Sequence, residues 1–424
     1  MTDYGEGGIM KRIFITPFAF ALAATVLLQV PVQADTEPRA YTVLHSFQDD
    51  GIDGLGPWAG LIDVGGTLYG TTLEGGPNCE VGGGCGTVFS INPTTGATSI
   101  LYYFRGVNYG DGKYPASGVI YVDGLLYGTT ISGGSSNLGT IFAVDPTTGA
   151  ETFRYSFREN TGDGYWPWAG LLNVKGTLYG TTSTGAGSTS WGTVFAFNPK
   201  TGKEKTIYAF KNNNSDACFP YASLIRFNGK LYGTTDAGAT LDLPTVFSID
   251  LKTHAEQLVF QFTNRAQGAV VNQSLVESNG LLYGTAQLGG AHDYGDVFAV
   301  DPNTGMQTVL YSFCNQPSCS DGDRPFAAVI VKKGILYGTT GDGGDTAGCN
   351  DGSGGGVVYS LDPNTGVETV LHTFECAPND GQGSQAPLLF VGTELYGTTI
   401  GGGTGVGGDC PVGRGCGTVF KLRR

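Results

Sequence analysis

The sequence predicts an all-β fold, a seven-bladed β-propeller of four-stranded antiparallel blades. The phrase Leu-Tyr-Gly-Thr-Thr occurs seven times at intervals of 51 to 59 residues, with Ala286 in place of one final Thr. A fixed period of this size marks a repeat architecture. Gly accounts for 71 of 424 residues and charged residues for only 14%, which suits short strands joined by tight turns. Each period also divides into the same four short segments.

The first segment of each period begins with a proline in most copies. A proline at the first position of a strand costs no hydrogen bond of the ladder. A tight turn such as Asn228-Gly229 leads to the repeated phrase, which forms the second strand. Its central glycine predicts a bulge or the close approach of a neighbouring backbone. A Gly-rich loop leads to the third strand, and a turn such as 145–149 leads to a fourth that ends in Phe. The expected first strands, A, are 57–62, 115–120, 167–172, 220–225, 271–276 and 325–330, with a last copy from Pro387.

The ends of the chain predict how the ring closes. Six fourth strands follow a third strand, whereas a seventh, residues 41–47, stands before the first repeat. The last repeat runs only to its third strand near Leu422. We therefore expect the N-terminal strand to pair with the C-terminal blade, which leaves no free sheet edge.

Three recurring motifs resemble those of the GloVer (Gloeo/Verruco) repeat family of exported bacterial proteins. They are Leu-Tyr-Gly-Thr-Thr as at 336–340, Gly-Thr-Val-Phe as at 417–420, and Val-Leu-Tyr-Ser-Phe-Cys as at 309–314. The resemblance covers nearly the whole chain beyond its leader. It implies a propeller-like exported protein and no established biochemical activity or catalytic residues.

The N-terminus has the layout of a secretory signal peptide. Lys11 and Arg12 precede an apolar run over 13–30, and Val32-Gln33-Ala34 ends in a small residue. We expect residues 1–34 to be this signal, with Met10 as a possible true start, and 35–424 to form one propeller domain. A membrane anchor is the alternative. The prediction is a secreted, periplasmic or cell-surface protein without a membrane span after cleavage.

Charge limits the partners. The formal net charge is −14 and the pI about 4.6. Nucleic acid binding needs a basic surface, so we expect none. The charge permits cationic ligands, divalent metals or neutral glycans. We expect a monomer that binds a glycan or a protein.

Nine cysteines agree with export to an oxidising compartment. Close spacing predicts disulfides between Cys79 and Cys85, Cys314 and Cys319, and Cys410 and Cys416. Cys349 and Cys376 form a further candidate pair. With four pairs among nine cysteines, Cys218 is the odd cysteine. A metal site is disfavoured because no CxxC motif or neighbouring histidine accompanies the cysteines.

The long B–C and D–A loops share one face of an antiparallel propeller, and we expect function there. An Asp-x-x-x-Pro motif recurs in the D–A loops. Each carboxylate is expected to cap its own loop; the alternative is a ring that collects Ca²⁺. Otherwise no cofactor is expected. These loop carboxylates are Asp53, Asp111, Asp163, Asp216 and Asp321.

Aromatic residues flank the same prolines and are expected near the mouth of the central channel. There they would stack on sugar rings, although packing between blades is an alternative. These candidate ligand-binding residues are Trp58, Tyr114, Trp166, Trp168, Phe219, Tyr221 and Phe326.

No catalytic signature is found. His45 and His372 stand where other copies have Tyr, which indicates structural substitution, and His292 beside Asp293 lacks a nucleophile. The leading hypothesis is an exported non-catalytic propeller that binds a glycan or protein through its long-loop face. The alternatives are a carbohydrate-active hydrolase or lyase that uses Asp111 and Asp163, and a structural cell-surface component.

Overall fold

The computed structural model describes residues 40–77, 83–159, 162–185, 191–211, 216–238, 243–344, 349, 352–405, 410 and 415–423. All of them belong to one compact unit, Arg39–Arg424. The expected signal peptide lies outside the described residues and stays a prediction. The helices of the described part are short 3-10 turns, η1 (Val107–Tyr109), η3 (Arg265–Gln267) and η4 (Pro317–Cys319). None is long and apolar enough to cross a membrane.

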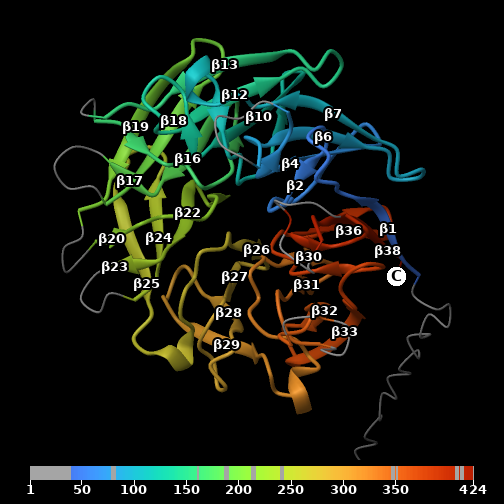
Figure 1. Ribbon diagram of the computed structural model, residues 1–424. Coiled ribbons are helices and arrows are strands. Elements are labelled where there is room, and N and C mark those ends of the chain that lie inside the picture. Colours follow the sequence, from blue (N-terminus) through green and yellow to red (C-terminus); the bar gives the residue numbers. More distant parts are fainter. Residues whose placement is uncertain are drawn as a thin grey trace, which may run out of the picture. The chain divides into compact units, whose positions relative to one another are not determined.

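Seven four-stranded antiparallel sheets follow one another along this unit as the predicted blades, which we name blade 1 to blade 7 in chain order (Figure 1). Each blade has the strand order A, B, C, D. Blade 1 is β3 (Ile62–Val64), β4 (Thr67–Thr72), β6 (Thr87–Ile91) and β7 (Thr98–Tyr103); blade 2 is β9 (Ile120–Val122), β10 (Leu125–Thr130), β12 (Thr140–Val144) and β13 (Glu151–Ser156). Blade 3 is β15 (Leu172–Val174), β16 (Thr177–Thr182), β18 (Thr193–Asn198) and β19 (Lys203–Ala209).

The remaining blades repeat this plan. Blade 4 is β21 (Ile225–Phe227), β22 (Lys230–Thr235), β24 (Thr245–Asp250) and β25 (Glu256–Gln261); blade 5 is β26 (Val276–Ser278), β27 (Leu281–Ala286), β28 (Asp296–Val300) and β29 (Gln307–Ser312). Blade 6 is β30 (Ile330–Lys332), β31 (Ile335–Thr339), β32 (Val357–Asp362) and β33 (Val367–Thr373). Blade 7 is β35 (Leu389–Val391), β36 (Glu394–Thr399), β38 (Thr418–Arg423) and β1 (Tyr41–Ser46).

The predicted closure is confirmed, because the N-terminal strand is the outer strand of blade 7. β1 pairs antiparallel with β38, with Tyr41 opposite Leu422 and Ser46 opposite Thr418. Nearer the channel, the Thr398 hydroxyl donates to the Ala59 carbonyl of blade 1 at 3.1 Å. Both ends of the repeat array are therefore joined, and the outer edge of β38 is covered.

Each residue of the repeated phrase has a separate structural role. In blade 3, Leu178 is fully buried, the Thr181 hydroxyl donates to the Ala222 carbonyl of the next blade at 3.3 Å, and the Thr182 and Thr193 hydroxyls bond within the blade at 2.7 Å. The first of these two threonine contacts recurs at every blade boundary. Threonines therefore link the blades to one another around the channel.

The prediction for the glycine of the phrase was wrong. Gly233 lies opposite Phe247 in the ladder, and a Cβ there would lie 2.7 Å from the Cζ of that ring. The close neighbour is the aromatic side chain of strand C, not a backbone, and the register runs through the glycine without a bulge. Glycine is required because the ring occupies the space above it.

The predicted first strands were too long. Strand A of blade 1 begins at Ile62, where the predicted segment ends, and the other copies behave likewise. Residues 57–61 instead run along the channel, with carbonyls that accept threonine hydroxyls from a neighbouring blade. Pro57 packs on Gly417 of blade 7, where a Cβ would lie 2.7 Å from the proline Cδ. The proline therefore joins blades rather than opening a strand.

Short two-stranded ladders cover the face that carries the long loops. Each pairs a D–A loop with the start of the B–C loop of the following blade. They are β2 (Gly54–Leu55) with β5 (Glu74–Gly75), β8 (Gly112–Lys113) with β11 (Ser132–Gly133), β14 (Gly164–Tyr165) with β17 (Thr184–Gly185), β20 (Ala217–Cys218) with β23 (Ala237–Gly238), and β34 (Gly381–Gln382) with β37 (Gly401–Gly402). Single bridges, Ala269 with Leu288 and Asp323 with Asp342, take their place at blades 5 and 6.

Candidate functional site

A left-handed residue holds each D–A loop between two blades. The Trp166 N–H donates to the Leu138 carbonyl of blade 2 at 3.0 Å, and its own carbonyl accepts from the Ser183 N–H of blade 3 at 3.2 Å. Bulky residues rarely adopt such positive φ angles. At this position of the seven D–A loops, φ lies between 52° and 67°, and five of the seven residues are not glycine. The seven are Gly56, Tyr114, Trp166, Phe219, Val270, Arg324 and Gly383. The segments that follow them are thereby aimed at the channel.

A cavity of about 460 Å³ opens where these segments reach the channel mouth. Four aromatic side chains line it, Trp58, Trp168, Tyr221 and Phe326, together with the amides of Asn272, Gln273, Gln287 and Gln385 and with Ala116. None of these described lining residues carries a charge. The volume lies within the roughly 300–1,000 Å³ of small-molecule sites. Aromatic faces with amide donors and acceptors suit a neutral, hydroxyl-rich ligand.

Four of the seven predicted aromatics therefore meet at one cavity. Trp58 is 37% exposed, and the rings of Trp168 and Tyr221 contact edge to face with centroids 6.1 Å apart. Tyr114, Trp166 and Phe219 are not among the lining residues, because they occupy the left-handed positions at the blade boundaries. Of these three, Trp166 is 42% exposed and packs on Tyr165, and Phe219 packs on Trp191.

The amides of the cavity were missed by the sequence reasoning. Asn272 and Gln385 occupy the same repeat position as Trp58 and Trp168, directly after the proline or its replacement. An alignment of the seven copies at this position would have indicated them, whereas a search for aromatics could not. The ring of equivalent positions reads Trp58, Ala116, Trp168, Tyr221, Asn272, Phe326 and Gln385.

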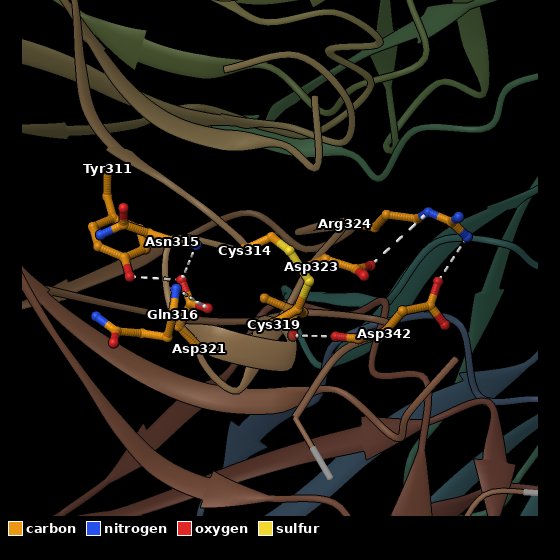
Figure 2. Close-up of a disulfide and its surroundings, with 10 residues drawn as sticks. Tyr311, Cys314, Asn315, Gln316, Cys319, Asp321, Asp323, Arg324 and Asp342 are labelled. Atoms are coloured by element: carbon orange, nitrogen blue, oxygen red, sulfur yellow. Dashed lines mark hydrogen bonds and ion pairs between the residues drawn. A yellow bond between two sulfur atoms is a disulfide. The ribbon is translucent and has the colours of Figure 1, made fainter. Parts of the chain in front are cut away.

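The loop carboxylates face their own loops. Asp111 is only 4% exposed; it accepts bonds from the Arg105 N–H at 2.9 Å and the Gly112 N–H at 2.6 Å. Figure 2 shows the same arrangement at Asp321, which accepts from the N–H groups of Asn315 at 2.9 Å and Gln316 at 3.1 Å. Asp53 and Asp216 accept comparable bonds. None of the five lines the channel-mouth cavity.

The same carboxylates bind an aromatic side chain of strand D. Tyr102, Tyr155, Tyr208 and Tyr311 donate to Asp111, Asp163, Asp216 and Asp321 at 2.6 to 2.9 Å. His45 and His372 lie 2.9 Å from Asp53 and from Asp380, so both histidines stand in for tyrosines. Asp380 was missed because Ser384 replaces the proline of its motif; Gln267 occupies the same position in blade 5.

A second acid lies beside four of these pairs. The Tyr155 hydroxyl lies 2.6 Å from Asp163 and 3.5 Å from Glu204 of the next blade. Burial, followed by the charge of the neighbouring aspartate, raises the pKa of Glu151, Glu204, Glu256 and Glu368 to about 7. These groups lie between outer strands, away from the channel mouth. Among the described residues, no three His, Cys, Asp or Glu side chains are placed to hold a metal ion.

Two predicted disulfides and the further candidate pair are confirmed. Cys314 is joined to Cys319, Cys410 to Cys416 and Cys349 to Cys376. Cys79 lies outside the described residues, so its pairing with Cys85 stays a prediction. Cys218 is buried in β20 and belongs to none of these three bonds. The Cys314–Cys319 bond lies in the D–A loop that carries Asp321, just before that residue.

Solved structures with a similar backbone share little sequence identity with this chain. An oligogalacturonate lyase from Vibrio parahaemolyticus is 10% identical, with a TM-score of 0.53 over 91% of this chain and 97% of its own. The extracellular domain of a putative hybrid two-component system from B. thetaiotaomicron is 14% identical, with a TM-score of 0.55 over 91% of this chain and 42% of that one. At such identities the likeness shows the fold alone.

Sequence comparison identifies the repeat itself. No curated protein matches the chain. The family model described as Gloeobacter/Verrucomicrobia repeat matches three overlapping stretches, residues 32–186, 80–295 and 152–350. These matches cover six of the seven copies of the repeated phrase, and the chain belongs to the Gloeobacter/Verrucomicrobia repeat family.

Proposed function

We propose that this propeller binds an uncharged glycan at the channel-mouth cavity of its long-loop face. The observation that carries the proposal is the composition of one cavity, in which four aromatic rings and four side-chain amides converge without a charged group. Sugar rings present flat C–H surfaces to aromatic faces, and their hydroxyls exchange hydrogen bonds with amides. A stable protein partner usually covers about 800 Å² of each surface, whereas the feature found here is a single cavity of small-molecule size.

The position of Ala116 supports a particular arrangement of the ligand. Ala116 stands between Trp58 and Trp168 in the ring of equivalent positions, and all three line the cavity. The small side chain leaves space between two tryptophans. A sugar ring in this space would contact an indole on either side.

The proposal favours binding over cleavage. A glycoside hydrolase uses two carboxyl groups that flank the bond to be broken. Asp111 and Asp163 instead accept hydrogen bonds from tyrosines, and neither lines the cavity. Export follows from the N-terminal pattern, and the three described disulfides agree with an oxidising compartment.

A glycan array on residues 35–424, followed by calorimetry on any glycan that binds, tests the proposal. Trp168→Ala should weaken binding about tenfold or more, since truncation of a central aromatic costs about 2 kcal/mol. Trp166→Ala is the matched control: it lies two residues away across Pro167, is exposed, and lies outside the cavity, so it should bind normally.

A second substitution tests the site from the opposite direction. Ala116→Trp should abolish binding by filling the space between Trp58 and Trp168, while leaving the far-ultraviolet circular dichroism unchanged. The proposal is wrong if no glycan binds, or if Trp166→Ala and Trp168→Ala weaken binding equally.

A further inference from the structure

A second cavity, of about 370 Å³, opens beside the channel mouth between blades 6 and 7. Phe326 and Gln385 line both this cavity and the mouth, so the two hollows share a wall. The Phe326 ring lies over Gly341, where any Cβ would overlap it. The two cavities are therefore adjacent, and a ligand long enough to cross Phe326 and Gln385 would reach both.

The second cavity differs from the mouth because it contains charged groups. Arg324 and Asp342 line it together with Gln382 and Gln385. The Arg324 Nη1 lies 2.8 Å from the Asp342 Oδ2, and its Nε lies 3.9 Å from the Asp323 Oδ1. Figure 2 shows both aspartates directed at the one guanidinium group.

The backbone holds this pair in place before any ligand arrives. Arg324 is one of the left-handed residues, with φ 52°. Its N–H donates to the Tyr294 carbonyl at 2.8 Å, and its carbonyl accepts from the Gly341 N–H at 2.9 Å. Asp342 is fixed by the two-way backbone bridge with Asp323. Such preorganisation lowers the entropic cost of binding.

The chemistry of the pair suits a neutral sugar. The guanidinium donates and the carboxylate accepts, so each can form a charge-assisted hydrogen bond with a hydroxyl group. Arg324 and Asp342 are already paired with each other, so a charged group on the ligand would have to displace one partner and leave that partner without its counter-charge. An uncharged, hydroxyl-rich group can bond to both side chains without breaking the pair.

We infer that the cavity between blades 6 and 7 is a second subsite for a further sugar unit, so that the ligand is an uncharged oligosaccharide that runs from the mouth across Phe326 to the Arg324–Asp342 pair. This inference rests on the proposed function of the mouth. It adds that a single sugar fills only part of the site, and that acidic and amino sugars are disfavoured at its outer end.

The test is calorimetry of the full chain with gluco-, manno- and N-acetylglucosamine oligosaccharides of one to six β-linked units. In the series that binds, affinity should rise about tenfold or more once the chain is long enough to reach Arg324, the factor expected from a charge-assisted hydrogen bond. Asp342→Asn and Arg324→Met should reduce the affinity of long oligosaccharides to that of short ones, and leave short ones unchanged.

Blade 5 offers a matched control. Arg265 and Asp293 form a pair at 2.7 Å on the same face, and neither residue lines the two cavities. Arg265→Met and Asp293→Asn should leave the dependence on chain length intact. Thermal unfolding of all four variants would identify any that fails to fold.

Several outcomes would overturn the inference and are distinct from failure at the mouth. If short saccharides bind but longer ones bind no more tightly, the second subsite is wrong and the mouth site stands. Equal losses in the blade 5 variants, or tighter binding of uronic acid or glucosamine oligomers of the same length, would also reject it. If no saccharide of any length binds, both proposals fail.

Discussion

At the scale of single residues, the repeated phrase is explained by contacts that cross strands and blades. Its Leu fills the core, and its first Thr joins two blades by a hydroxyl bond, as Thr71 does with the Ser117 carbonyl at 2.9 Å. Its second Thr pairs with a Thr of strand C in five of the blades. In blade 6 Thr340 instead accepts from the Val357 N–H at 3.0 Å, and in blade 5 Ala286 lies in this place, opposite the buried Asp296. The glycine that precedes the two threonines makes room for an aromatic ring of strand C.

Replacement of that glycine should be costly because an added side chain would overlap the aromatic ring. The backbone angle at this position is one that any residue can adopt. Gly233→Ala is expected to lower the free energy of unfolding by about 1–3 kcal/mol, the usual cost of overpacking, since its Cβ would lie 2.7 Å from Phe247. In a Phe247→Leu background the same change should cost less. Denaturant titration of the four proteins measures this coupling, and equal costs in both backgrounds would contradict the explanation.

At the scale of elements, the outer strand of blade 7 comes from the opposite end of the chain. β1 and β38 are more than 370 residues apart in sequence, yet they pair over the length of β1. The sequence predicted this pairing because strand counts balance only in a closed ring. It could not predict that residues 57–61 and their equivalents leave the sheet, since channel contacts with neighbouring blades decide this.

A strand supplied separately should restore the ring. A chain that begins at residue 48 should have a lower melting temperature than the full chain, because β38 loses its partner. A synthetic peptide of residues 40–47 should raise that temperature with increasing concentration, as expected of a ligand that binds only the folded form. A peptide with Val43→Pro is the control, and equal effects of both peptides would count against strand pairing.

At the scale of the whole molecule, acidic pairs recur at four blade boundaries. Burial raises the pKa of Glu151, Glu204, Glu256 and Glu368 from 4.5 to about 7. Burial also raises the pKa of Asp296 well above 3.8. Folding therefore takes up protons at pH values between 4.5 and about 7. The stability that the four glutamates contribute is full below pH 4.5 and is lost as the pH rises through 7.

We therefore expect the protein to melt at a higher temperature at pH 5 than at pH 8. Glu204→Gln should narrow this difference, because the amide is uncharged at both values and can still face the Tyr155 hydroxyl. Glu159→Gln, in an exposed loop, is the control and should leave the difference unchanged. Scanning calorimetry at the two pH values measures it, and a melting temperature that rises toward pH 8 would refute the assignment.

The sequence by itself determined the blade number, the strand order, the closure of the ring and the capping role of the loop aspartates. All of these follow from local periodicity and from turn residues whose effect is short-range. Only the tertiary structure decided which aromatics meet. Trp166 and Trp168 are the same type of residue and flank the same proline. The left-handed backbone at Trp166 keeps that side chain at the blade boundary, whereas Trp168 faces the channel. The amides of the cavity likewise come from blades 5 and 7, and the Arg324–Asp342 pair joins two loops of blade 6, so neither arrangement can be read from local periodicity.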